Sequence, residues 1–442
     1  MKYLTYLITC TALLLSLPST RAEPPPQAPH PPGAAVQDYI DFAKRACARV
    51  KGDIPKITHI AEICAQRHIR GGHLRLTWNS QGFVDEIWGR SGGLVHLGDG
   101  REFKSDRTPQ ERSQDIVFVG WQRAPTMNKL DELRERKAYG AYLIGFGPWA
   151  MPELTEYVDL CDVWFDTGFG SDDRVVAIPD GTRAGHGNML FDMLHGWTFF
   201  GEFVAALTRE GKMPPMWQAY LYEEGVAWGN RYLKKTQFHD DFEIPPIPPG
   251  ELARRYLDHM EGLFDKLARE QMVNINKAAD LIVAEHKQGR KTVCASMGHT
   301  PYTYVCAYEG QKWGVNANLH SFKQNQVEAY STDTADGALV LRVGYFGTNA
   351  KTLGILEDKQ QRVMFISAGT ERDGEVNEGG VTIKAVPDDA LVYIDMGMQF
   401  GDATLELKGY PIRILPPSGI MQLVTYECVN VEVLTRLAIA AN

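Results

Sequence analysis

The sequence predicts an α/β protein built from two tandem doubly wound domains, each with a five-stranded parallel sheet flanked by helices. Short apolar runs alternate with intervals long enough for a helix, as expected for right-handed βαβ units. A Pro-rich segment, 236–250, divides the chain near its middle. The order of strands and helices before this segment starts again after it. We therefore expect the two domains to pack as a pseudo-twofold pair.

Composition limits the classes of function that the chain can have. It has 442 residues, of which 44% are hydrophobic and 23% are charged, and its formal net charge is −9. These values suit a globular protein of two domains. No block of Lys and Arg is present, so nucleic acid is not expected as a partner.

The N-terminal segment has the pattern of a secretory signal peptide. Residues 1–22 combine a basic start, an apolar run and small residues before Ala22. The run is short for a membrane span, and an uncleaved anchor is the alternative. Residues 23–33 are Pro-rich and predict an extended tether. We expect an exported protein, periplasmic or extracellular, without stable membrane insertion after cleavage.

Seven cysteines are scattered along the chain without a CxxC pair. A zinc site is therefore not expected, and no cofactor is expected either. A disulfide bond is chemically possible in an exported protein. Cys161 and Cys294 lie beside or inside predicted strands, which favours a role as small core residues.

The first domain is predicted to cover 34–235. Its apolar spacing predicts two helices between 34 and 70, broken near Gly52. Long helices are expected from 185 to about 209 and from 216 to 235. The five strands are expected from Gly71, before a polar loop, and at 91–97, 115–120, 141–147 and 161–166.

The second domain is predicted to cover 251–442. Helices are expected from 251 to about 287. Strands are expected from Thr292 and at 338–343, 362–369 and 390–395. The loop 344–349 joins a buried strand to a helix start and carries small polar side chains. Such a loop suits an anion, and an ordinary βα turn is the alternative.

Internal similarity supports a duplicated domain. The run Val163–Gly168 matches Val392–Gly397, and Val117–Trp121 matches Leu341–Tyr345. A repeat period near half the chain length indicates two copies of one domain. A homodimer of such a chain is also compatible with this arrangement.

Taken together, these features resemble the tandem SIS (sugar isomerase) domain family, in particular the isomerase half of glucosamine-6-phosphate synthase. The segment Asp85–Val95 also resembles the Arg-Ala-Gly-Gly-Leu region of phosphoheptose-isomerase-like SIS domains. The resemblance extends over about residues 34–441. It implies five-stranded parallel sheets and a phosphosugar-type ligand bound by three loops at the carboxyl ends of the strands.

Carried over position by position, the resemblance implies ligand-binding residues in both halves. In the second half, Tyr345–Asn349 occupies the phosphate-loop position. The family's catalytic glutamate has no single match: Asp172 and Asp173 lie nearest in the first half, and Glu406 in the second. The implied ligand-binding residues are Asn79, Ser80, Thr126, Ser296, Thr300, Tyr345, Gly347, Thr348, Asn349 and Ser418.

Aldose–ketose isomerisation needs a group that moves a proton between adjacent carbons. We predict His186 and His299 as the catalytic candidates, with helix capping or core packing as the alternative for each. Gly185 and Gly187 would allow a close backbone approach to a ligand. His195 is expected to face the interior, and the run 239–243 to be solvated.

The leading interpretation is a protein that binds a sugar phosphate or a related sugar and performs isomerase-type acid–base chemistry. A non-catalytic exported sugar-binding or sensing protein is the second. A lyase or etherase that acts on a cell-wall aminosugar is the third. The plentiful Trp and Tyr side chains could stack on a sugar ring or fill the domain interface.

Overall fold

The fold is taken from a computed structural model of the chain. It describes residues 31–77, 81–98, 107–123, 125, 128–222, 224–233, 237–296, 312–317, 335–369, 376–378 and 381–441. The predicted signal peptide and most of the predicted tether lie outside these ranges. Five predicted site residues also lie outside them: Asn79, Ser80, Thr126, His299 and Thr300.

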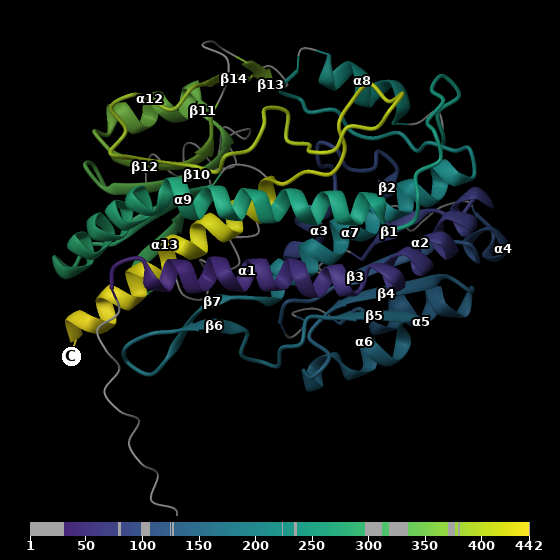
Figure 1. Cartoon of the computed structure of the whole chain (residues 1–442), viewed down its shortest axis with the longest axis horizontal. Helices are drawn as coiled ribbons and strands as arrows, with labels where there is room; N and C mark the ends of the chain where they lie inside the picture. The colour runs from purple at the N-terminus through teal and green to yellow at the C-terminus, as the bar shows by residue number, and fades with distance from the viewer. Residues whose placement is uncertain are drawn as a thin grey trace, which may run out of the picture.

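Two five-stranded sheets, both entirely parallel, organise the chain (Figure 1). The first has the order β2-β1-β3-β4-β5 and the second the order β15-β12-β10-β8-β9, which is the same order read from the other edge. The predicted fold class is therefore confirmed. The strands are β1 (Leu74–Leu76), β2 (Leu97–Gly98), β3 (Ile116–Gly120), β4 (Tyr142–Gly147), β5 (Val163–Asp166), β8 (Thr292–Ser296), β9 (Gly314–Ala317), β10 (Leu339–Phe346), β12 (Arg362–Ala368) and β15 (Val392–Asp395).

Helices flank the sheets and fill the space between them. The helices of the first half are α1 (Ala34–Gly52), α2 (Ile54–Ile69), α3 (Gln81–Ile87), α4 (Pro109–Arg112), α5 (Leu130–Ala138), the 3₁₀ turn η1 (Pro152–Leu154), α6 (Thr155–Leu160), α7 (Asn188–Arg209) and α8 (Gly225–Tyr232). The described helices of the second half are α9 (Glu251–Lys287), α12 (Ala350–Asp358) and α13 (Ser418–Ala441). The two helices predicted between 34 and 70, and the break between them, are confirmed.

Two small antiparallel sheets were not predicted. One is the hairpin of β6 (Arg174–Ala177) and β7 (Arg183–His186), and the other has the order β11-β14-β13. The strands of the latter are β11 (Thr348–Asn349), β13 (Val376–Glu378) and β14 (Val381–Lys384). Edge strand β9 was also missed. All of these strands are short, so they carry little periodicity in the sequence.

Two predicted elements are wrong for one shared reason. The strand expected at 91–97 is shortened to β2 (Leu97–Gly98), and the helix expected at 216–235 is shortened to α8 (Gly225–Tyr232). Instead, Leu94 and Met216 form an antiparallel bridge, and Trp217 exchanges backbone hydrogen bonds of 2.7 Å with Gly92 and Gly93. Long-range pairing of these two segments replaces both elements, and a local pattern cannot reveal it.

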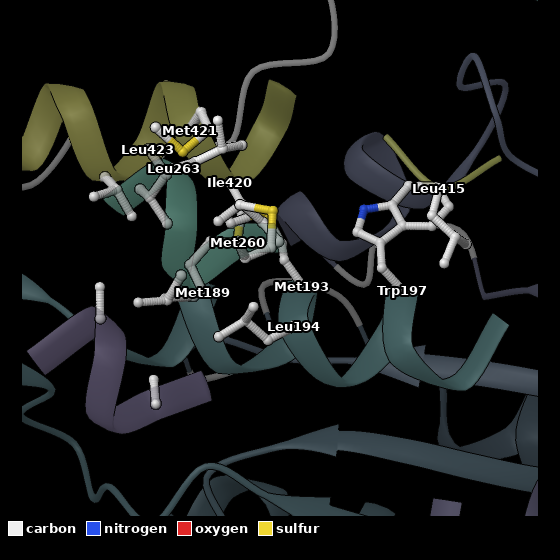
Figure 2. Close-up of a cluster of buried hydrophobic side chains, with 14 of the residues drawn as sticks. Met189, Met193, Leu194, Trp197, Met260, Leu263, Leu415, Ile420, Met421 and Leu423 are labelled. Carbon is white, nitrogen blue, oxygen red and sulfur yellow. The ribbon is translucent and has the colours of Figure 1, made fainter. Parts of the chain in front are cut away.

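The core lies between the two halves. Helix α7 is buried all round over residues 188–208, as expected for an apolar helix inside a protein. Figure 2 shows Met193 of α7 beside Met260 of α9, and Trp197 of α7 beside Leu415, which precedes α13. Helix α7 contacts both α9 and α13. Helix α1 also packs on α9 and α13. The helices that join the halves therefore belong to one hydrophobic core.

A buried glutamate fixes the start of α9, directly after the Pro-rich segment. Glu202 of α7 accepts backbone N–H bonds from Gly250 at 2.6 Å and Ala253 at 3.0 Å. Its carboxylate also accepts the Thr58 hydroxyl at 2.9 Å. Negative charge at a helix N-terminus satisfies amides that have no partner inside the helix. One side chain thus ties α2, α7 and α9 together.

We expect Glu202→Ala to lower the free energy of unfolding by about 2–3 kcal/mol, because it leaves buried donors without an acceptor. Chemical denaturation of the purified protein measures this change. Glu251→Ala is the matched control, because Glu251 lies in the same first turn, has a side chain that is 40% exposed and pairs with Arg255 across one helical turn. Its expected effect is within about 0.5 kcal/mol. Equal effects of the two substitutions would contradict the capping role.

The described residues show neither a membrane-spanning helix nor a metal-binding group. None of the helices there has the length and apolar composition to cross a membrane. No group of three or more His, Cys, Asp or Glu side chains within these ranges is placed to hold a metal ion. The described cysteines, Cys47, Cys64, Cys161, Cys294 and Cys428, are all reduced, and Cys294 is buried in β8 as predicted.

Candidate functional site

Two related polar clusters lie at the N-termini of α7 and α13, the long helices that follow the fifth strand of each sheet. In the first, Asp173 Oδ2 accepts the backbone N–H of Asn188 at 3.0 Å. In the second, Asp402 Oδ1 accepts the backbone N–H of Ser418 at 3.2 Å. Each helix thus begins with an aspartate on its first amide, where negative charge is favourable. We name them the His186 cluster and the Arg90 cluster after the basic residue in each.

The His186 cluster pairs an imidazole with a carboxylate. His186 ends β7 and Asp173 precedes β6, so the hairpin brings them together. His186 Nδ1 lies 2.7 Å from Asp173 Oδ1, and the two side chains are 15% and 14% exposed. With its carboxylate also held by Asn188, Asp173 keeps the proton on Nδ1 and fixes the ring. Nε2 is then the ring atom left for proton exchange, and it lies buried beneath the surface of the cluster.

A second carboxyl group lies beside this pair. Asp192 is fully buried in α7, and its Oδ2 accepts Gln122 Nε2 at 2.7 Å. Burial raises the pKa of Asp192 well above its ordinary value, against the Gln122 hydrogen bond, and the charge on Asp173 raises it further. Burial thus favours the protonated form of Asp192, which can donate a hydrogen bond. The cluster therefore combines a carboxyl group paired with an imidazole and a second, fully buried carboxyl group.

The side chain of Asn188 connects the ends of two parallel strands, β3 and β5, at this cluster. Asn188 Nδ2 donates to the Gln122 backbone oxygen at 3.0 Å, and Thr167 Oγ1 donates to Asn188 Oδ1 at 2.5 Å. Gln122 follows β3, and Thr167 follows β5. The cluster therefore sits at the carboxyl ends of the parallel strands, where ligands bind in open α/β sheets.

The second half of the chain contributes to the same place. Glu427, buried in α13, accepts the His186 backbone N–H at 3.2 Å. Tyr39 of α1 donates its hydroxyl to the His186 backbone oxygen at 2.8 Å. The backbone of the predicted catalytic histidine is thus fixed by helices from both ends of the chain.

The two glycines beside His186 have a different role from the one expected. Gly185 has φ of +73°, and a Cβ there would lie 2.8 Å from Tyr39 and 2.9 Å from Val431. A Cβ on Gly187 would lie 2.5 Å from Phe169. These glycines admit neighbouring side chains of the protein, because α1 and α13 pack directly against the hairpin.

The Arg90 cluster brings together two predicted ligand-binding residues. The guanidinium of Arg90, which follows α3, donates to the Tyr345 hydroxyl and to Ser418 Oγ. It lies 3.4 Å from Asp402 Oδ2 and 3.9 Å from Glu86 Oε2. Arg90 is 2% exposed, and Ser418 is fully buried. Both predicted residues are therefore held by a side chain from the first half.

The predicted phosphate loop is built into a sheet. Gly347 has φ of +58°, and a Cβ there would lie 1.8 Å from the Lys384 backbone oxygen. Thr348 and Asn349 form β11, which pairs antiparallel with β14. Ser296 ends β8 beside Val343 of β10, at the same end of the second sheet. The loop thus meets β14 closely, which the sequence did not indicate.

The Arg90 cluster contains more acid than base. Burial raises the pKa of Glu86 to about 7, although Arg90 and the Trp197 indole N–H at 2.9 Å oppose the rise. Burial raises the pKa of Asp402 to about 6, against the effects of Arg90 and Ser418. The single positive charge of Arg90 can balance only one of the two carboxylates. Asp402 lies nearer to Arg90 than Glu86 does, so Glu86 is the group that holds a proton near neutral pH.

This arrangement predicts a pH-dependent stability. A carboxyl group with a raised folded-state pKa stabilises the protein below its unfolded pKa, and this contribution is lost as the pH rises through the folded value. Between pH 4.5 and 8 we expect Glu86 to lower the free energy of unfolding by on the order of 1–3 kcal/mol. Glu86→Gln should flatten that part of the profile, as measured by denaturation at several pH values. Parallel profiles for the two proteins would contradict the assignment.

The two clusters differ in their chemical capacity. The His186 cluster contains an imidazole held by a carboxylate, an arrangement typical of a general base. In the Arg90 cluster the guanidinium stays protonated, because its ordinary pKa is above about 12, and the carboxyl groups around it are buried. We therefore take the His186 cluster as the candidate for acid–base catalysis.

The other singled-out residues lie elsewhere. Asp172 pairs with Arg174 at the surface, and Glu406 pairs with Arg413. His195 is buried as predicted, 3.0 Å from Asp53. The expectation that 239–243 is a solvated run is wrong for His239, which is buried and bonded to Asp241 and to the Tyr410 hydroxyl.

Sequence reasoning missed several residues of the two clusters. Asp192 lies four residues after Asn188, so helical spacing places both on one face of α7, and that signal was available. Arg90 and Glu86 lie within the segment Asp85–Val95 that suggested the family resemblance. Glu427 gave no signal, because its contact with His186 spans 241 residues.

Comparisons with known proteins gave matches among solved structures. A protein assigned as a phosphosugar isomerase from Clostridium difficile 630 has 8% identity, covers 90% of this chain and 93% of its own, and has a TM-score of 0.46. A protein assigned as sugar binding from Salmonella typhimurium LT2 has 8% identity, coverages of 90% and 99%, and a TM-score of 0.46. The C-terminal domain of glucosamine-fructose-6-phosphate aminotransferase from Francisella tularensis has 10% identity, coverages of 88% and 96%, and a TM-score of 0.41.

The resemblance to sugar-isomerase proteins expected from the sequence thus reappears among the structures. No protein-family model matches the chain. No curated protein matches it either. Identities of this size leave the chemistry of a site open, so the function below is argued from the side chains of this chain.

Proposed function

We propose that the protein binds a sugar or sugar derivative at the His186 cluster and interconverts its aldose and ketose forms. The observation that carries this proposal is the 2.7 Å contact between His186 Nδ1 and Asp173 Oδ1 at the start of α7. A carboxylate-held imidazole at the carboxyl ends of parallel strands is a suitable general base.

The reaction moves one proton from C2 of the aldose to C1. His186 Nε2 accepts the proton from C2, which gives an enediol, and returns it to C1. The carbonyl oxygen gains a proton in the first step and the C2 hydroxyl loses one in the second. Asp192, whose pKa is raised by burial and whose Oδ2 accepts the Gln122 amide, is the group proposed to donate and recover that proton.

The charges of the cluster bear on the substrate. Two basic side chains lie at the cluster: His186, which lies with Asp173 and Glu427, and Arg49, which donates to the Thr167 backbone oxygen at 2.6 Å. The two carboxyl groups beside His186 disfavour a phosphate next to the imidazole ring, so we propose a neutral sugar as the substrate. A neutral sugar also agrees with the export that we propose from residues 1–22, since phosphosugars are mainly cytoplasmic metabolites.

Hydrogen exchange tests the proposal. The protein lacking residues 1–22 is incubated in deuterium oxide with neutral aldoses, aminosugars and their 6-phosphates, and NMR follows the products. We expect a ketose that carries deuterium at C1 for at least one neutral sugar. Failure of every sugar to isomerise or to exchange its C2 proton would exclude isomerase chemistry.

A binding protein without catalysis is the second candidate. The observation that favours it is the Arg90 cluster, where Tyr345 and Ser418 are already bonded to Arg90. Two of the expected ligand-binding residues are thus used to join the two halves of the chain. This function would be supported if calorimetry detected binding of a sugar while NMR detected no deuterium in that sugar or its ketose.

A further inference from the structure

A cavity of about 670 Å³ lies between the segment after α7 and the loop that joins β15 to α13. Its lining residues Gly401 and Ala403 flank Asp402, so the cavity adjoins the Arg90 cluster, and none of its lining residues belongs to the His186 cluster. In Figure 1 that loop runs beside α8. The volume is within the range of about 300–1,000 Å³ that small-molecule sites have. The lining residues are Trp217, Gln218, Ala219, Tyr222, Gln399, Phe400, Gly401, Ala403, Glu406, Leu407, Tyr410, Pro411, Ile412 and Arg413.

Aromatic rings of this cavity are held rigidly. The indole of Trp217 lies against Gly229 of α8, where a Cβ would come within 2.1 Å of the ring. The ring of Tyr222 packs edge-on against Phe400 with centroids 5.4 Å apart, and its hydroxyl donates to the Phe400 backbone oxygen at 3.3 Å. Rigid rings lose little conformational entropy when a ligand stacks on them.

Between the rings, the lining is polar and its charges cancel. Arg413 Nη2 and Nε lie 2.7 Å and 3.1 Å from Glu406 Oε1, and its Nη1 donates to Gln399. Gln218 adds a further amide to the lining. One Glu and one Arg are the charged lining residues, so the wall carries no net charge. Amides and a planar ion pair can both donate to and accept from hydroxyl groups.

We propose that this cavity binds a neutral carbohydrate of about disaccharide size. A sugar ring has an apolar face of C–H groups that stacks on aromatic rings and an equator of hydroxyls that pairs with amides. An anionic ligand would have to compete with Glu406 for Arg413. Because Glu406 is already paired and exposed, the site binds and does not catalyse. The inference is independent of the chemistry proposed at the His186 cluster.

The test is a titration of the whole chain from residue 23 with maltose, cellobiose and N,N′-diacetylchitobiose, followed by calorimetry and tryptophan fluorescence. We expect saturable binding of at least one disaccharide with a dissociation constant in the millimolar range or below. Trp217→Ala should weaken it at least about tenfold through the loss of stacking. Gln218→Ala, which removes one half-buried amide and no packing ring, should weaken it about threefold without a change in thermal midpoint.

Two controls separate this site from other sites. Trp149→Ala removes an indole that is 63% exposed on the first half, and it should leave the affinity unchanged. Asp173→Asn should also leave it unchanged, whatever its effect at the His186 cluster. Absence of saturable binding at millimolar disaccharide would overturn the proposal. So would binding that both Trp217→Ala and Gln218→Ala leave intact, or that Asp173→Asn abolishes.

Discussion

Asp173→Asn is expected to lower the isomerisation rate by about 100- to 10,000-fold while the protein stays folded. The asparagine keeps the size of the side chain and can still accept the Asn188 amide. It cannot hold the proton on His186 Nδ1 as a carboxylate does, so the imidazole loses its fixed tautomer and some of its basicity. Turnover of the sugar identified by deuterium exchange gives the measurement, and thermal unfolding checks the fold.

The neighbouring residue provides the matched control. Asp172 pairs with Arg174 at the surface, 2.8 Å from its Nε, and this hydrogen bond is the strongest, and His186 the weakest, of the influences that lower the pKa of Asp172. Asp172→Asn should therefore change turnover by less than about threefold. Similar losses of turnover in the two variants would indicate a structural role for the hairpin contact. So would a loss of turnover in Asp173→Asn that is accompanied by a matching fall in its thermal midpoint.

Arg90→Met is expected to lower the free energy of unfolding by about 3–5 kcal/mol, the largest stability effect that we predict for a single substitution. Arg90 is buried with Asp402 and Glu86, and methionine fills a similar volume without the charge. Removal of the guanidinium leaves buried carboxyl groups without a cation and the Tyr345 and Ser418 hydroxyls without their donor. Denaturant unfolding at pH 7 gives the measurement.

The size of this effect depends on burial, so an exposed arginine is the appropriate comparison. Arg134 also bridges two acids, Asp131 and Glu156, but its side chain is 53% exposed. Arg134→Met should cost less than about 1 kcal/mol. The pair Arg90→Met with Asp402→Asn should recover part of the loss, since it removes the unpaired charge. Equal costs for Arg90 and Arg134 would refute the buried-cluster interpretation.

The sequence predicted much of the scaffold. The runs Ile116–Gly120, Tyr142–Gly147 and Arg362–Ala368 are apolar and become central or near-central strands, because strands buried on both faces must be apolar along their length. The repeat Val163–Asp166 with Val392–Asp395 marks the same edge of the two sheets. Elements formed by short or distant pairing, such as the Leu94–Met216 bridge, leave no local pattern and were missed.

The candidate site was predicted only in part. His186, Tyr345 and Ser418 were named from the sequence, and the structure places each at the carboxyl end of its sheet. Their partners Asp173, Arg90 and Asp402 could not be assigned, since a polar side chain carries no information about what it faces. Five further predicted residues lie outside the described part of the chain, so their roles stay predictions.

By itself, the sequence determined two parallel α/β halves, the Pro-rich break between them and the histidine at the start of a long helix, because periodicity and turn chemistry are local properties of a chain. The tertiary structure alone decided that one helix start holds a His–Asp pair and the other a buried Arg. That choice depends on contacts such as Arg90 with Ser418, 328 residues apart, which form only when the two halves share one core.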